Sequence, residues 1–132
     1  MHIRSKRKDK KNKIRNKGKS LNKREVGTQK ELQAMRYLEK QGMKILQRNF
    51  RCHMGEIDLI AQDGACIVFV EVKYRTSSRY GSPFEAVNAR KQTTIRKVAQ
   101  YYLLGRKQLD CPVRFDVVGI CGNELEHIKN AF

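Results

Sequence analysis

The fold is decided by residues 56–73, which read EIDLIAQDGACIVFVEVK. Two apolar runs, residues 56–61 and 66–73, flank the dipeptide Asp63-Gly64. A turn dipeptide of this kind between apolar runs is the strongest short-range signal for a β-hairpin. We therefore expect two antiparallel strands joined by a tight turn at Asp63 and Gly64.

The segment before this hairpin has the spacing of a helix. Leu32, Met35 and Leu38 recur at intervals of three residues, which places them on one face of a helix predicted for residues 26–41. The apolar residues in 43–50 are compatible with a further strand, which would precede the hairpin.

The segment after the hairpin carries a signal for a helix start. Ser82 would be the N-cap, Pro83 the first helical residue, and Glu85 the second member of a capping box. The helix is expected to run to about Leu104, followed by a strand over residues 113–121 and a short last element.

This order of elements predicts the fold class. A strand ending at Lys73, a long helix and a strand starting at Val113 form a βαβ crossover, whose two strands are parallel. Because the hairpin strands are antiparallel, the sequence predicts an α/β fold with a mixed β-sheet flanked by helices.

Composition divides the chain into a tail and one domain. Of the 29 Lys and Arg, twelve fall in residues 1–24 beside a single acid, Asp9, and the whole chain carries a net charge of +16. A segment so charged and so poor in apolar residues is expected to be a disordered basic tail. Residues 25–132 would then be the folded domain. The tail is either an arm that binds nucleic acid or a solubilising segment.

Several classes of protein are disfavoured. No apolar run approaches the ~20 residues of a membrane helix, and the basic start is not followed by the apolar segment of a secretion signal. The four cysteines form no C-x-x-C pair, and the three histidines complete no zinc spacing. We therefore expect a cytoplasmic protein with reduced thiols, no membrane association and no zinc site.

Four polar residues interrupt the apolar hairpin strands: Glu56, Asp58, Glu71 and Lys73. Burying such groups costs several kcal/mol unless they are paired or bind a metal. Glu71 and Lys73 are two residues apart and share one face of their strand. With the predicted turn, Asp58 would lie opposite Phe69 and diagonal to Glu71, which gathers two carboxylates and an ammonium in one patch.

This patch has the chemistry for phosphodiester hydrolysis. Two carboxylates and a backbone carbonyl such as that of Val72 can hold Mg²⁺ or Mn²⁺ with water positions left open. The metal would polarise the phosphate and activate a water. Lys73 would orient or deprotonate that water, or neutralise charge that builds up on the phosphate. The alternative is a structural ion pair in which Lys73 neutralises Asp58 and Glu71.

Motifs in the chain resemble known families. Asp58, followed after twelve residues by Glu71-Val72-Lys73, resembles the D…(D/E)xK core of the restriction-endonuclease-like nuclease superfamily. The wider pattern resembles the bacterial YraN family over residues 25–132. It consists of GxxxExxA at 27–34, GEIDLI at 55–60, FVEVK at 69–73, RFDVV at 114–118 and NAF at 130–132.

The resemblance implies a restriction-endonuclease-like fold and a metal-dependent endonuclease that acts on DNA structure, such as branched or repair intermediates. It implies that Asp58, Glu71 and Lys73 are catalytic. It also implies that Glu31 joins Asp58, Glu71 and Val72 around the metal, because related Holliday-junction resolvases place a Glu of the first helix there. Nucleases of this superfamily often dimerise, so a homodimer is implied as well.

Basic residues follow the motif and the expected helix start. Arg75, Arg79, Arg90 and Lys91 would either hold phosphates that flank the site or form a solvated surface. The rival function is a non-catalytic module that binds RNA or DNA through the basic tail. In that case the acidic patch would be structural.

Other polar and aromatic residues have simpler interpretations. Tyr80, Tyr101 and Tyr102 are able to stack on bases, but Tyr102 fits the apolar stripe of the long helix and is expected to pack in the core. For Asp116, inside an apolar strand, we expect a structural ion pair with Arg114 or a neighbour.

Overall fold

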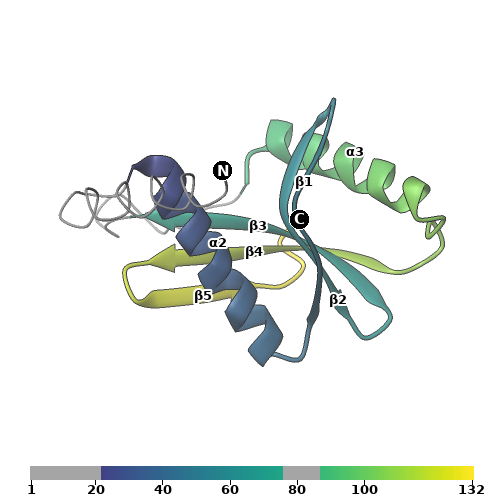
Figure 1. Ribbon diagram of the computed structural model, residues 1–132. Coiled ribbons are helices and arrows are strands. Elements are labelled where there is room, and N and C mark those ends of the chain that lie inside the picture. Colours follow the sequence, from purple (N-terminus) through teal and green to yellow (C-terminus); the bar gives the residue numbers. More distant parts are fainter. Residues whose placement is uncertain (1–21, 76–86) are drawn as a thin grey trace, which may run out of the picture.

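The computed structural model describes residues 22–75 and 87–132 (Figure 1). In chain order its elements are helix α2 (Lys23–Lys40), strands β1 (Lys44–Cys52), β2 (Gly55–Asp63) and β3 (Cys66–Arg75), helix α3 (Ala89–Gly105), and strands β4 (Val113–Cys121) and β5 (Glu124–Ile128). Neither of these two helices has the length and apolar character needed to cross a membrane.

The five strands form one sheet in the order β1-β2-β3-β4-β5. β3 and β4 are parallel, whereas the other neighbouring strands are antiparallel. The predicted α/β class with a mixed sheet is therefore confirmed, and so is the parallel pair joined through α3. The two helices lie on opposite faces of the sheet (Figure 1).

Each face of the sheet has its own apolar core, and β3 contributes to both. Ile67 and Phe69 pack on the α3 side, while Val68 and Val70 pack on the α2 side. Because side chains alternate along a strand, a continuous apolar run is the pattern of a strand buried on both faces. Glu71 follows this run and continues the α3-facing row.

Helix α2 begins three residues earlier than predicted. The Asn22 side chain accepts a hydrogen bond from the Glu25 amide at 2.9 Å, and the Glu25 carboxylate accepts one from the Asn22 amide at 3.4 Å. This capping box satisfies two amides of the first turn. Residues 22–24, which were expected in the tail, therefore belong to the helix and its cap. The remainder of the predicted tail lies outside the described residues.

Helix α3 begins later than predicted. Its N-cap is Asn88, whose side chain accepts a hydrogen bond from the Lys91 amide at 2.8 Å. Val87 and Asn88 are not helical, so the prediction of a continuous helix from Ser82 to Leu104 is wrong in that part. The predicted capping residues at 82–85 lie outside the described part of the chain.

The hairpin register also differs from the prediction. Asp63 pairs with Cys66, so the loop is Gly64-Ala65 rather than Asp63-Gly64. Gly64 takes a φ of 61°, a left-handed conformation that favours glycine. Asp63 stays in β2, where its carboxylate accepts a hydrogen bond from Arg114 at 3.1 Å. Asp63 therefore belongs to the sheet through its pairing with Cys66 and contacts β4 through its side chain.

Candidate functional site

The candidate site lies at a fork between β2 and β3. The last pair of their ladder is Leu59 with Val70, whereas β3 continues beside β4 as far as Arg75. Asp58 and Glu71 are the first residues beyond the last pair, and continuing the ladder by one pair would place them opposite each other. The expectation that Asp58 lies opposite Phe69 was therefore wrong by two residues along β3, because the turn lies one residue later than predicted.

The backbone changes course at Asp58. Ile57 packs in the α3-side core and Leu59 in the α2-side core, although residues two apart in a regular strand share a face. On β1, Asn49 sits across from Asp58 between two regular pairs and has a φ of 50°. Both strands are thus irregular at this level, and the break turns the Asp58 side chain toward β3.

The Asp58 carboxylate replaces the missing neighbour of β3. Its Oδ2 accepts a hydrogen bond from the Val72 amide at 2.8 Å, so this amide keeps a partner beyond the end of the ladder. In a paired strand the N–H and C=O of one residue point to the same neighbour. We therefore expect the Val72 carbonyl to face the fork as well.

Asp58 and Glu71 form a carboxyl pair. Burial, the hydrogen bond with Glu71 and the charge of Glu71 together raise the pKa of Asp58 to about 8, while the Val72 amide acts in the opposite direction. Two carboxyl groups in contact cannot both ionise at low cost, so they hold a proton between them or attract a cation. This arrangement fits a divalent cation, because Mg²⁺ commonly takes one or two protein carboxylates and keeps several waters.

Lys91 enters the site from the first turn of α3. Its Nζ lies 3.0 Å from Glu71 Oε2, and the Glu71 side chain is only 9% exposed. Burial acts to lower the pKa of Lys91, but the contact with Glu71 raises it overall. The sequence placed Lys91 among cations that hold flanking phosphates or face solvent; the structure brings it against an acid of the candidate site.

Glu31 approaches the fork from α2. Burial raises the pKa of Glu31, a hydrogen bond with Asn49 opposes this effect, and the charge of Glu31 contributes to the raised pKa of Asp58. Within residues 22–75 and 87–132, however, no three Asp, Glu, His or Cys side chains are grouped closely enough to hold a metal ion. The structure therefore brings Asp58 and Glu71 together and leaves Glu31 beside them.

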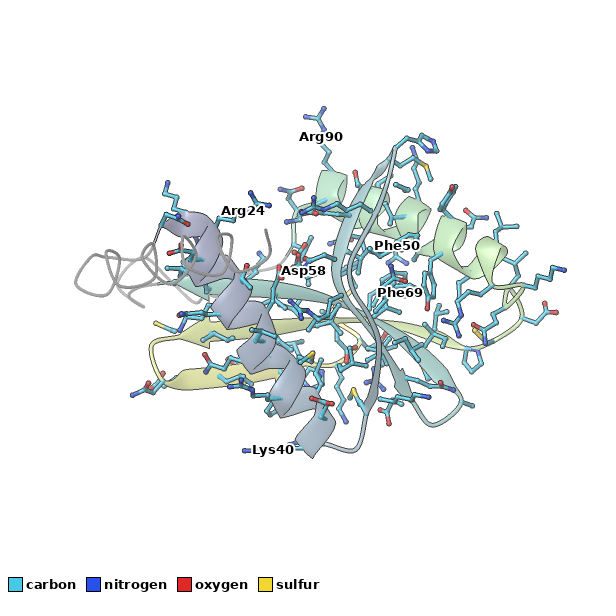
Figure 2. All side chains as sticks on the ribbon, in the orientation of Figure 1. Arg24, Lys40, Phe50, Asp58, Phe69 and Arg90 are labelled. Carbon is cyan, nitrogen blue, oxygen red and sulfur yellow. The ribbon has the colours of Figure 1, made fainter. Side chains whose placement is uncertain are left out.

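The other predicted residues surround this pair. Lys73 is partly buried two residues after Glu71, on the same face of β3 by strand alternation. Arg75 and Arg90 are exposed, and Figure 2 shows Arg90 directed away from the sheet, with Asp58 between the ribbons of α2 and α3. Arg79 lies outside the described residues. Both partners of the Arg51–Glu56 ion pair, at 2.8 Å, are exposed.

A second polar cluster lies on the α2-facing side of β4. Arg114 donates two hydrogen bonds to the fully buried Asp116, at 2.9 and 3.0 Å, so the predicted ion pair is confirmed. His127 Nε2 lies 2.7 Å from Asp116, and the Asn130 amide donates at 3.0 Å. These last two contacts carry no signal in the sequence, because β5 and the C-terminal turn supply them.

Comparisons with known proteins give the family. The model of the uncharacterised protein family UPF0102 matches residues 30–120. The UPF0102 protein of Caldicellulosiruptor saccharolyticus is 46% identical over 118 residues, which span 85% of this chain and all of the relative. The UPF0102 protein of Geobacter metallireducens is 50% identical over 117 residues, which span 86% of this chain and 96% of the relative. The chain therefore belongs to family UPF0102, the YraN family that its motifs resemble.

Proposed function

We propose that this protein is a metal-dependent endonuclease that selects DNA by its structure rather than by its sequence. The observation that carries the proposal is the contact between the Asp58 and Glu71 carboxyl groups at the β2–β3 fork. A carboxyl pair in a partly enclosed site, next to a lysine on the same strand face, is the arrangement that metal-assisted phosphodiester hydrolysis requires.

Each residue then has a role. Asp58 and Glu71, with the Val72 carbonyl, would hold Mg²⁺ or Mn²⁺, and Glu31 would add negative charge from α2. When bound, the cation supplies polarisation of the phosphate and a more acidic water. Lys73 orients the attacking water and offsets charge on the phosphate oxygens.

Cations around the pair would hold the substrate. Lys91 has its ammonium at the site, and Arg75 and Arg90 are exposed on β3 and α3. Contacts of this kind bind phosphates without reading bases. The chain carries no zinc-finger or helix-turn-helix signature. These features support selection of DNA shape, such as branched or repair intermediates.

One observation favours a second function. Lys91 already neutralises Glu71, so the acidic pair is also compatible with a structural ion cluster in a protein that does not cleave. The protein would then be a binding module for RNA or DNA, using the basic residues before α2. The two functions differ in their need for a divalent metal.

A cleavage panel separates them. Purified protein with Mg²⁺ or Mn²⁺ is offered single-stranded, duplex, flap and four-way DNA, and matching RNA. We expect metal-dependent cleavage of branched DNA that Asp58→Asn and Lys73→Ala abolish and that Glu56→Gln, at an exposed acid nearby, retains. Binding without cleavage by all variants would support the binding module. Cleavage by Lys73→Ala at the parent rate would show that the chemistry lies elsewhere.

A further inference from the structure

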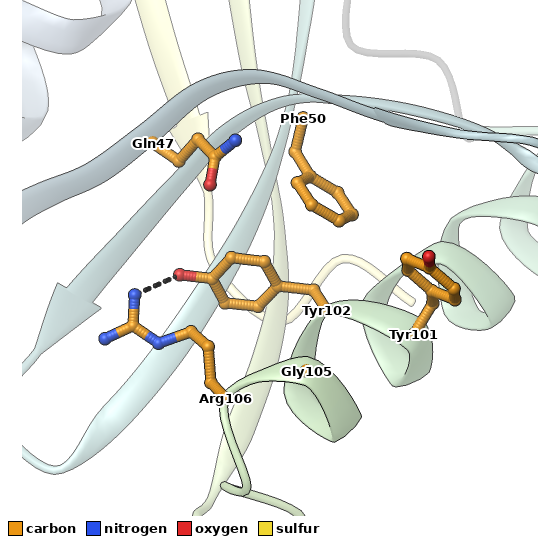
Figure 3. Close-up of a pocket in the computed structure, with 6 residues that line it drawn as sticks. All are labelled: Gln47, Phe50, Tyr101, Tyr102, Gly105 and Arg106. Carbon is orange, nitrogen blue, oxygen red and sulfur yellow. Dashed lines mark hydrogen bonds between the residues drawn. The ribbon is translucent and has the colours of Figure 1, made fainter.

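A pocket opens between β1 and the C-terminal end of α3, away from the acidic pair (Figure 3). Its volume is about 260 Å³, just below the roughly 300–1,000 Å³ of pockets for drug-sized ligands. A single ring system is a suitable occupant for this space. The lining residues are Gln47, Phe50, Tyr101, Tyr102, Gly105 and Arg106.

Aromatic rings form one end of the pocket. The rings of Phe50 and Tyr101 lie 6.3 Å apart at a tilt of 39°, within the contact range of an aromatic pair. Tyr102 is buried and meets Phe50 edge-on at 5.1 Å, so it fixes the position of that ring. Tyr101 remains 48% exposed, although its ring is large and mostly apolar. An exposed ring held in this way is available for stacking.

Polar groups form the opposite end. Figure 3 shows the Gln47 amide and the Arg106 guanidinium there, with the Tyr102 hydroxyl between them. Arg106 Nη1 donates to that hydroxyl at 2.7 Å. Gln47 reaches the pocket because β1 is irregular between Ile45 and Gln47, and such bulges redirect side chains. The amide can both donate and accept hydrogen bonds.

We propose that this pocket binds one unstacked nucleobase of a DNA strand whose backbone runs to the candidate site, an inference that rests on the proposed function. A base has flat apolar faces and a polar edge, which match the rings and the polar groups at the two ends. A base inside a duplex cannot enter without being unstacked and unpaired. The pocket therefore selects DNA that contains an unpaired strand.

The distance along α3 suits one strand that spans both places. Lys91, at the acidic pair, and Tyr102 are eleven residues apart on this helix, which corresponds to about 17 Å at ~1.5 Å per residue. A stacked strand crosses this distance in about five nucleotides at ~3.4 Å each, and an extended strand needs fewer. The base in the pocket is then a few nucleotides from the phosphate at the site.

The test compares the affinity for a strand that carries bases with the affinity for a strand that has only the sugar-phosphate backbone. Binding of a single-stranded oligonucleotide and of an abasic strand of the same length is measured with EDTA present, so cleavage plays no part. Wild type should prefer the strand with bases, and Tyr101→Ala should reduce that preference by roughly 5- to 150-fold, the range for stacking of one base. Leu104→Ala is the matched control, because Leu104 is 56% exposed on the same helix and does not line the pocket.

The outcomes separate this inference from the proposed function. A preference for bases that is equal in wild type and Tyr101→Ala, or absent from wild type, overturns the pocket, whatever the cleavage panel gives. A preference lost only in Tyr101→Ala supports the pocket even if no DNA is cut. A second measurement uses wild type alone: a strand carrying 5-iodouracil should photocrosslink to the peptide that contains Tyr101, and crosslinks confined to other peptides would contradict the proposal.

Discussion

The carboxyl groups of Asp58 and Glu71 are in contact at the point where β2 and β3 separate, and burial together with this contact raises the pKa of Asp58 to about 8. The ladder that would have paired the two backbones ends one residue earlier. Where the strands separate, the Val72 amide has no partner on the β2 backbone, and it donates a hydrogen bond to the Asp58 carboxylate instead. The irregularity of the sheet and the chemistry of the site therefore have one origin.

The carboxyl pair should cost stability at neutral and alkaline pH. Because the pKa of Asp58 rises from 3.8 to about 8 on folding, the folded state holds the proton more tightly, and stability is lost as the pH rises through this range. Asp58→Asn imitates the protonated acid, since its amide can donate to Glu71 while its oxygen accepts from Val72. We expect its free energy of unfolding at pH 8, without metal, to exceed that of wild type by about 1–2 kcal/mol.

Thermal unfolding between pH 5 and 9 in EDTA measures this effect. The advantage of Asp58→Asn should grow with pH, whereas Glu56→Gln should change stability little, because Glu56 is exposed. If Asp58→Asn is less stable than wild type at pH 8, the two carboxyls do not repel each other as described.

Lys91 should stabilise the protein only in the absence of a divalent metal. Lys91→Met removes the partner of the buried Glu71, which we expect to cost about 1 kcal/mol, because the lysine itself is half exposed. Mg²⁺ should restore much of this loss by taking the place of the ammonium. The matched control is Lys97→Met, at an exposed position of α3. Equal responses of the two variants to Mg²⁺ would contradict this role of Lys91.

The Asp116 cluster should make the fold sensitive to acid. Burial acts to raise the pKa of Asp116, but its hydrogen bonds with His127, Arg114 and the Asn130 amide lower it overall, below 3.8. The corresponding stabilisation is complete above pH 3.8 and is lost as the pH falls through the lower, folded-state pKa. Asp116→Asn should lose about 3–5 kcal/mol at pH 7 and less in acid.

Urea unfolding at pH 7 and at pH 3 gives this difference directly. The control is Asp110→Asn, at an exposed position, which shows how the free energy of unfolding changes when a carboxylate outside this cluster is lost. A loss for Asp116→Asn that is the same at both pH values would mean that ionisation of Asp116 does not contribute to folding.

The basic residues before α2 should bind nucleic acid without regard to sequence. Deleting residues 1–21 removes ten Lys and Arg but leaves the capping residue Asn22, so the unfolding temperature should barely change. Each phosphate contact that is lost should reduce the slope of log affinity against log salt by about 0.9 on duplex DNA. Equal salt slopes for the full and shortened chains would show that these cations do not touch DNA.

Local patterns predicted the elements, but not the way they meet. The apolar run before Glu71 identified β3, and Tyr102, which fits the apolar stripe of the long helix, lies on the buried face of α3 as expected. The start of α3 was misplaced because Ser82 and Asn88 are both capable of capping, and sequence alone does not choose between them.

The candidate site was also predicted only as far as local patterns reach. Strand alternation and the family motif indicated Asp58, Glu71 and Lys73. The contact of Glu71 with Lys91 joins β3 to α3, and the spacing of residues within one element does not predict a contact between two elements. The backbone is irregular at Asn49 and Asp58, where the side chains of β2 change from one core to the other, and the two cores exist only in the assembled sheet.

Direct measurement of Mn²⁺ binding tests the central claim most closely. Electron paramagnetic resonance or calorimetry at pH 8 should find one Mn²⁺ per wild-type chain, no comparable binding by Asp58→Asn or Glu71→Gln, and unchanged binding by Glu56→Gln. Since Asp58→Asn is expected to be more stable than wild type, its loss of binding cannot come from unfolding. Absence of Mn²⁺ binding by wild type, or equal binding by Asp58→Asn, would contradict a metal site at the β2–β3 fork.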